Sequence, residues 1–280
     1  MSEITARELY EICKIPCHEL ENHPRLKVRF RLCRDSAEMG QIMARELVEE
    51  IEQHNARSQL TRAILPCGPT CWYEPFADLV NRRRVSLRGL VVFHMDECLD
   101  WQGQELPRGH PYSFRGFMEK HFYGPIVPEL AVPEENRNWL NARNPDDIRE
   151  KIRAAAVDVT YGGWGQDGHV AYNQTRRHPF SRITLDELRN STVRIQENNL
   201  DTILASTGEI IEVPKRAVHG CRTQIVTKVR DAAKMAANWS SALETEDAMT
   251  LLHRVVFYGD HMESVRHLAN LMDLKVIEEG

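Results

Sequence analysis

The segment from Ala155 to Gln174 reads AAVDVTYGGWGQDGHVAYNQ and indicates the architecture expected for the whole 280-residue chain. Its first part, 155–160, is a short apolar run that predicts a buried strand. The glycines that follow allow the backbone to come close to a bound small molecule. Asp167 and His169 fall where the strand passes into a loop. In an open parallel sheet this is the expected place for a ligand.

Short apolar runs alternate with helical patterns along the rest of the chain. LVVFHM, 90–95, is almost continuously apolar, which is typical of a strand buried on both faces of a parallel sheet. The predicted fold class is therefore α/β: a three-layer, Rossmann-like sandwich with a mainly parallel sheet and helices on both faces. We expect strands at 27–33, 61–66, 90–95, 155–160, 223–229 and 254–258, and helices at 36–54, 72–83, 112–122, 146–156, 231–243 and from about 262. Residues 1–26 are expected to form a helical extension before a single domain, 27–280.

Composition and charge exclude several classes of protein. Apolar residues make up 42% of the chain, which is enough for a sizeable core. A formal net charge of -5 and a pI near 6.2 give no basic footprint, so nucleic acid is not an expected partner. No window approaches the roughly 18 apolar residues of a membrane helix. The N-terminus lacks the layout of a secretory signal, and the seven scattered cysteines suit reduced thiols, so we expect a cytoplasmic protein.

Polar residues follow several of the predicted strands, and a parallel sheet would bring them to one edge. Asp96 and Glu97 come directly after 90–95 and are expected to enter the following loop, where partial desolvation would make Asp96 a competent base. A histidine populates both protonation states near neutrality, which suits His169 as a proton carrier. The alternatives are a carboxylate that caps a turn and a hydrogen-bonded loop histidine. Since His94, Asp96 and His169 have no recognised ligand spacing, no metal site is expected.

Two further features suggest that the site binds an anion. Gly68-Pro69-Thr70 lies between a predicted strand and a predicted helix, whose N-terminus would supply amides and positive potential. Lys234, near the start of a later predicted helix, would add a cation. The alternatives are an ordinary Gly-Pro turn and a solvated lysine. The polar segment 176–199 is a candidate lid over the site.

Taken in order, these segments resemble the glucosamine-6-phosphate isomerase/deaminase family. The resemblance runs from about residue 27 to near the C-terminus. LPCGPT (65–70) is similar to the family's LPTGGT, FHMDECLD (93–100) to FNMDEYVG, GGWGQDGHVAYNQ (162–174) to GGVGxDGHIAFNE and VPKRAV (213–218) to VPKYAL. HPYSFRGFM (110–118) and VPEENRNWLN (132–141) also follow the family pattern.

The resemblance implies an enzyme that opens the ring of a phosphorylated amino sugar, isomerises the aldose to a ketose and releases ammonia. It implies that Asp96 removes the C2 proton and that His169, oriented by Asp167, is the ring-opening acid and base. No cofactor is implied, and a homo-oligomer is expected. The residues expected to hold the substrate and its phosphate are Gly68, Thr70, Glu97, Arg194 and Lys234.

Three positions depart from the family pattern. Gln174 stands where the family has a glutamate, and it cannot ionise to support a charged histidine. Pro69 removes one amide donor from the loop. The family's lid arginine aligns with Asn198, so Arg194, which the sequence places one helical turn earlier, is the candidate to replace it. These changes predict an altered substrate, whose anionic group could be a sulfonate. Two alternatives remain open: a sugar-lactone hydrolase on the same fold, and a catalytically weakened regulatory protein that binds a sugar phosphate.

Overall fold

The structure is a computed structural model of residues 1–280. It describes residues 7, 11, 14–24, 30–100, 102–163, 171–172 and 190–198, together with the backbone of 216–219 and 255–257. The predicted strand at 223–229 and the predicted helices at 231–243 and beyond 262 lie outside the described residues. None of the helices in the described ranges has the length and apolarity that crossing a bilayer would require.

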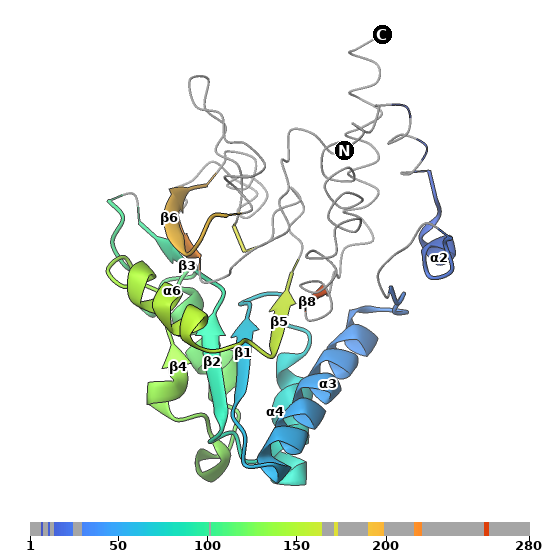
Figure 1. Ribbon diagram of the computed structural model, residues 1–280, viewed down its shortest axis with the longest axis horizontal. Coiled ribbons are helices and arrows are strands. Elements are labelled where there is room, and N and C mark those ends of the chain that lie inside the picture. Colours follow the sequence, from blue (N-terminus) through green and yellow to red (C-terminus); the bar gives the residue numbers. More distant parts are fainter. Residues whose placement is uncertain are drawn as a thin grey trace.

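A five-stranded parallel sheet forms the centre of the molecule (Figure 1). Its order is β4-β2-β1-β5-β8, and every neighbouring pair is parallel. This confirms the predicted fold class. The strands are β1 (Thr61–Leu65), β2 (Leu90–His94), β4 (Arg137–Asn138), β5 (Val159–Gly162) and β8 (Val255–Phe257).

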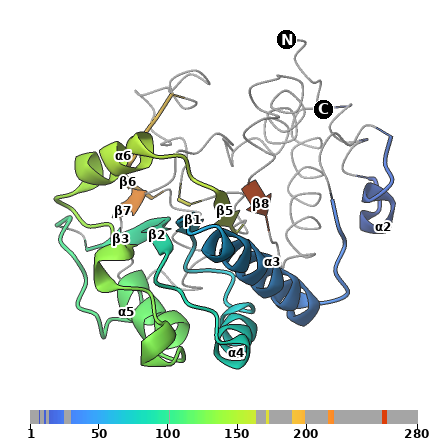
Figure 2. The same cartoon turned by 60° about the horizontal axis from the view of Figure 1, so that its bottom comes forward.

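Helices cover both faces of this sheet (Figure 2). On one face lie α3 (Ser36–Ala56), α4 (Tyr73–Arg83) and α5 (Phe114–Met118), which continues as a π-helix, η1 (Glu119–Tyr123). On the other face lies α6 (Pro145–Ala154). The other helical elements of the described residues are short: α2 (Cys17–Leu20) and the 3₁₀ turns η2 (Pro128–Leu130) and η3 (Glu134–Asn136).

Side chains along the central strands alternate between two cores. In β1, Ala63 and Leu65 pack with α3 and α4, whereas Ile64 packs with Phe93 and with Ile148 of α6. Successive side chains of a strand point to opposite faces, so a sheet covered by helices on both sides needs apolar residues at consecutive positions. This requirement explains the nearly continuous apolar run in β2.

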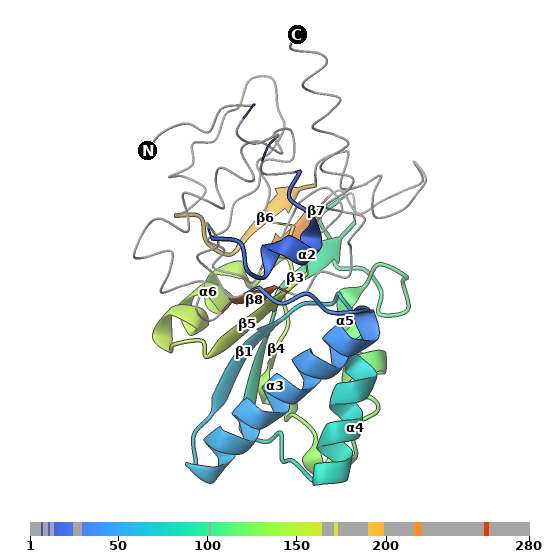
Figure 3. The ribbon, with the colours of Figure 1, turned by 90° about the vertical axis from the view of Figure 1, so that its right-hand side faces the viewer.

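A second, antiparallel sheet lies at the carboxyl end of the first (Figure 3). It consists of β3 (Asp96–Leu99), β7 (Arg216–His219) and β6 (Arg194–Glu197), in the order β3-β7-β6. The expectation that Asp96 and Glu97 enter a loop is therefore wrong, since they begin a strand. Arg194 likewise lies on a strand and not on a helical turn. Both strands pair with β7, a partner distant in sequence that local patterns do not reveal.

Two of the strand predictions also need correction. Residues 30–33 of the predicted strand 27–33 are irregular, and the amide of Leu32 donates to Glu21 Oε1 at 2.7 Å instead of to a neighbouring strand. The strand predicted at 155–160 begins later, at Val159. Just before it, Asp158 exchanges two hydrogen bonds with the backbone of Arg62 in β1, at 2.7 and 2.8 Å, which fixes where β5 enters the sheet.

Gly40 of α3 gives a test of this packing. A Cβ at this position would lie 2.2 Å from the backbone oxygen of Cys71, just before α4. Alanine improves helix propensity by about 1 kcal/mol, but overpacking against backbone costs about 1–3 kcal/mol. We therefore expect Gly40→Ala to lower the free energy of unfolding, measured by urea denaturation, while Gln41→Ala on the exposed side of α3 does not. Equal stabilities of the two variants would contradict this packing.

Candidate active site

The loop between β1 and α4 is fixed on its inner side and open on its outer side. The buried Tyr73 donates its hydroxyl to the backbone oxygen of Cys67 at 2.6 Å, and its amide donates to the backbone oxygen of Thr70 at 3.1 Å. Gly68 and Thr70 are exposed. The loop thus presents Gly68 and Thr70 to solvent on a backbone that the core holds in place.

The end of β5 packs directly against this loop. A Cβ on Gly163 would lie 2.7 Å from the backbone oxygen of Gly68 and 3.2 Å from Cδ of Pro69. Only a residue without a side chain fits this approach. The glycine-rich segment and the loop at 66–70, which are distant in sequence, therefore begin at the same edge of the sheet, as predicted.

Asp96 lies beside the same loop. The amide of Met95, the residue before it, donates to the backbone oxygen of Leu65 at 3.0 Å, at the end of β1. Burial, followed by the nearby carboxylates of Asp96 and Glu97, raises the pKa of the Cys67 thiol. Asp96 is itself half-buried. A partly desolvated carboxylate next to an exposed loop is a suitable base for a small substrate.

The antiparallel sheet places Arg194 on the same face as Asp96. His219 of β7 is the register partner of Asp96 on one side and of Arg194 on the other. The Arg194 guanidinium donates to Gln196 Oε1 at 3.1 Å and to Ser191 Oγ at 2.7 Å. Burial lowers the pKa of Arg194, but an arginine side chain stays protonated in proteins. One face of this sheet thus carries both a base and a cation.

The chain that follows His169 runs beside β3. Ala171 packs with Met95 and Leu99, and Tyr172 packs with Cys98. The ring of Tyr172 also stacks on Phe114, with centroids 5.9 Å apart. The four remaining predicted site residues lie outside the described residues, and their roles stay predictions: Asp167, His169, Gln174 and Lys234.

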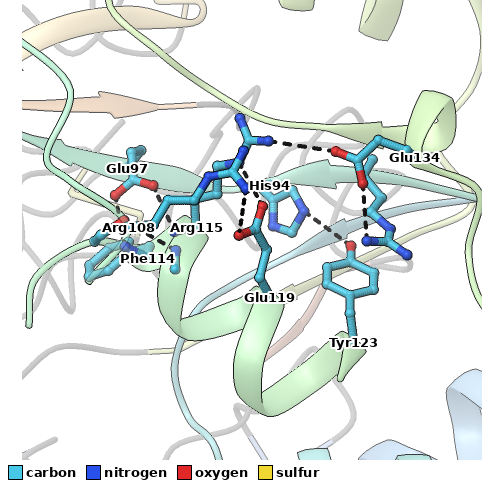
Figure 4. A network of polar contacts seen from close by, with 11 residues as sticks. His94, Glu97, Arg108, Phe114, Arg115, Glu119, Tyr123 and Glu134 are labelled. Atoms are coloured by element: carbon cyan, nitrogen blue, oxygen red, sulfur yellow. Dashed lines mark hydrogen bonds and ion pairs between the residues drawn. The ribbon is translucent and has the colours of Figure 1, made fainter. Parts of the chain in front are cut away.

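Glu97 anchors the start of α5 (Figure 4). Its buried carboxylate accepts from the amides of Cys98, Phe114 and Arg115 at 2.9, 2.8 and 2.7 Å. Burial raises the pKa of Glu97 to about 7, against the opposing effect of the three amides. The structure thus accounts for Glu97 as an acceptor that ties α5 to β3, and its contact with substrate stays a prediction.

His94, at the end of β2, is committed to the interior (Figure 4). Its Nε2 lies 3.1 Å from the Tyr123 hydroxyl, and its ring stacks on Trp139 at 3.6 Å. Burial, followed by the positive charges of Arg115 and Arg137, lowers the pKa of His94 well below its ordinary value. His94 is therefore neutral, and Tyr123 and Trp139 hold its ring in the core. In the described ranges, no three His, Cys, Asp or Glu side chains lie close enough to hold a metal ion.

The structure adds residues to the site that the sequence did not single out. Gly163 belongs to the glycine run quoted above, so its residue type indicated a close approach of the backbone. The sequence did not indicate that this approach is to the loop at 66–70. The residue types of Tyr73 and Gln196 gave no signal of their contacts. Tyr73 acts through a hydroxyl that reaches back to Cys67, and Gln196 through a contact with Tyr172, in a distant part of the chain.

No family model matches the chain. It is 31% identical over 195 residues to a glucosamine-6-phosphate deaminase of Cronobacter sakazakii, a match that covers 65% of this chain and 66% of that relative. A solved structure of a monomeric glucosamine-6-phosphate deaminase superposes with a TM-score of 0.55 at 17% identity, covering 85% of this chain and 98% of that one. The 6-phosphogluconolactonase of Plasmodium vivax gives 0.50 at 16% identity, covering 89% and 96%. Both structures share the fold.

The raised pKa of Glu97 predicts that the free energy of unfolding depends on pH. Its carboxyl titrates near 4.5 in the unfolded chain and at about 7 in the folded protein, so the folded state binds the proton more tightly. Stability from this group is therefore present at low pH and is lost as pH rises from about 4.5 to about 7. We expect Glu97→Gln to remove this slope from the unfolding free energy measured by urea denaturation. Glu74→Gln, an exposed carboxylate on α4, is the control. A slope that survives in Glu97→Gln would refute the assignment.

Proposed function

Because the chain belongs to the glucosamine-6-phosphate isomerase/deaminase family as a divergent member, we propose that it is an enzyme that converts a phosphorylated amino sugar from aldose to ketose and releases ammonia. The observation that carries the proposal is the position of Asp96. This half-buried carboxylate lies beside the exposed loop that contains Gly68 and Thr70, at the edge where the glycine-rich segment begins. A base and a loop that can bind an anion, both at that edge, suit a small phosphorylated substrate that gives up a proton.

The chemistry proposed for the site needs only the substrate's own groups. His169, oriented by Asp167, moves the proton of the C1 hydroxyl to the ring oxygen, so that the bond between C1 and the ring oxygen breaks and a C1 carbonyl forms. Asp96 then takes the proton from C2, the electrons of the broken C–H bond form a C1=C2 double bond, and the former carbonyl oxygen takes up a proton. Protonation at C1 gives an iminium at C2. Water adds to that carbon, and ammonia leaves with the ketose as the other product.

The anionic end of the substrate would lie between the loop and the antiparallel sheet. Gly68 offers its backbone, and Thr70 offers both its amide and its hydroxyl. Arg194 is the proposed cation on the sheet side, and its planar guanidinium matches a phosphate or sulfonate in two-point geometry. Lys234 is the second proposed cation. Pro69 lacks an amide, so the loop would contribute fewer donors than a glycine pair at these positions.

We further propose a single domain from 27 to 280, a cytoplasmic location and a homo-oligomer.

Gln174 is the argument for the alternative of a regulatory protein that binds a sugar phosphate without turning it over, because an amide cannot share a proton with His169. Gln174→Glu separates the two. A gain in ammonia release supports an enzyme with an altered site, whereas binding without turnover in both forms supports the regulatory protein.

Asp96→Asn tests the proposed base. The amide keeps the shape of the side chain and cannot accept the C2 proton, so ammonia release from glucosamine-6-phosphate should fall by about 10²–10⁴-fold. The measurement is a coupled ammonia assay, with Asp78→Asn on the exposed side of α4 as the control for charge. If the unaltered protein releases neither ammonia nor ketose, the assignment of this substrate fails.

Isotope exchange distinguishes the lactone hydrolase. Removal of the C2 proton by Asp96 should wash deuterium from D₂O into C2 of recovered substrate, detected by mass spectrometry. Hydrolysis of a lactone has no such step. Ester cleavage with no exchange would replace the isomerase proposal by the hydrolase.

A further inference from the structure

The hydroxyl of Tyr73 contacts the loop at 66–70 from the core side. Tyr73 is 4% exposed, and burial raises the pKa of its hydroxyl well above the ordinary value, so the hydroxyl keeps its proton. Three acceptors lie around this one proton: the backbone oxygen of Cys67 at 2.6 Å, Sδ of Met118 at 2.7 Å and the backbone oxygen of Pro66 at 3.4 Å. A thioether is a weak acceptor and the Pro66 oxygen is farther away, so the hydroxyl donates to Cys67.

This hydrogen bond determines which way the next amide points. The carbonyl of Cys67 and the amide of Gly68 belong to one planar, trans peptide group, in which C=O and N–H point in opposite directions. Because Tyr73 holds the carbonyl toward the core, the Gly68 amide is directed away from the core. Gly68 is exposed, and within the described ranges no group accepts a hydrogen bond from its amide.

The loop has few other backbone donors. Pro66 and Pro69 have no amide hydrogen, so only three of the five residues at 66–70 can donate from the backbone. Hydrogen bonds from backbone amides to an anion are stronger than those between neutral groups. With so few donors, the direction of a single amide has a large effect on how tightly the loop binds an anion.

We propose that Tyr73 is a positioning residue, whose buried hydroxyl holds the Cys67 carbonyl so that the Gly68 amide faces the anionic group of the substrate. The proposal deepens the proposed function and rests on it for the assignment of the anion to this loop. The base is held separately, because Asp96 follows Met95, whose amide donates to the end of β1. Loss of the Tyr73 hydroxyl should therefore weaken anion binding and leave the proton transfer in place.

The first test is a kinetic comparison of Tyr73→Phe with Tyr123→Phe. Tyr73→Phe removes only the hydroxyl, so KM for glucosamine-6-phosphate should rise about tenfold, the effect of one hydrogen bond to a charged group, and kcat should change far less. Tyr123 is 5% exposed and its hydroxyl lies 3.1 Å from His94 Nε2, outside the loop. Tyr123→Phe should leave KM unchanged. An unchanged KM in Tyr73→Phe, or an equal rise in both variants, would overturn the proposal.

Nuclear magnetic resonance reads the Gly68 amide itself. The chain has 15 glycines, so ¹⁵N-labelled glycine gives few signals, and Gly68→Ala identifies the signal of Gly68, since a Cβ there would meet nothing within 4 Å. Inorganic phosphate should move the Gly68 amide proton downfield in the unaltered protein and in Tyr123→Phe, but far less in Tyr73→Phe. A shift of the same size in all three proteins would contradict the positioning role, as would no shift in the unaltered protein.

Urea denaturation separates positioning from general loss of structure. Both variants lose a buried hydroxyl contact, so the free energy of unfolding should fall in both, whereas only Tyr73→Phe should lose the response to phosphate. A response that is lost in both variants would make the role of Tyr73 merely structural. If Tyr73→Phe alone loses the response while the unaltered protein releases neither ammonia nor ketose from glucosamine-6-phosphate, the proposed function fails and the role of Tyr73 stands.

Discussion

The candidate site depends on how the chain leaves the parallel sheet at Met95. The amide of Met95 continues the ladder by donating to Leu65, and the next residue, Asp96, already pairs in the antiparallel sheet. With a single residue between β2 and β3, Asp96 has to lie where the two sheets meet. A longer connection would let the carboxylate move relative to the β1 loop. The single-residue connection fixes Asp96 where the two sheets meet.

Alternation along β3 distributes the remaining contacts. Asp96 and Cys98 share one face, on which the sheet also carries Arg194, and Cys98 packs against Tyr172. Glu97 points the other way, to the start of α5. Two adjacent carboxylates therefore have different environments, one half-buried beside a loop and one buried among backbone amides. Such separation of environments allows neighbouring acids to take different roles.

Local patterns in the sequence predicted the parallel sheet well, because burial on both faces leaves a continuous apolar run such as that of β2. They failed where pairing is long-range. Nothing near Asp96 signals that β7 will pair with it. The alternation of 27–33 fits a strand, yet the amide of Leu32 donates to a glutamate. In the site, the sequence predicted that Gly68, Thr70 and Asp96 converge, while the contacts of Gln196 required the folded chain. Asp167, His169, Gln174 and Lys234 stay predictions.

Two neutral side chains, Gln196 and Ser191, accept hydrogen bonds from the Arg194 guanidinium. These two contacts orient the guanidinium without placing a negative charge at either position. A carboxylate in either place would form an ion pair and compete with an anionic substrate for the same cation. An arginine that these neutral acceptors orient suits a substrate that brings its own negative charge.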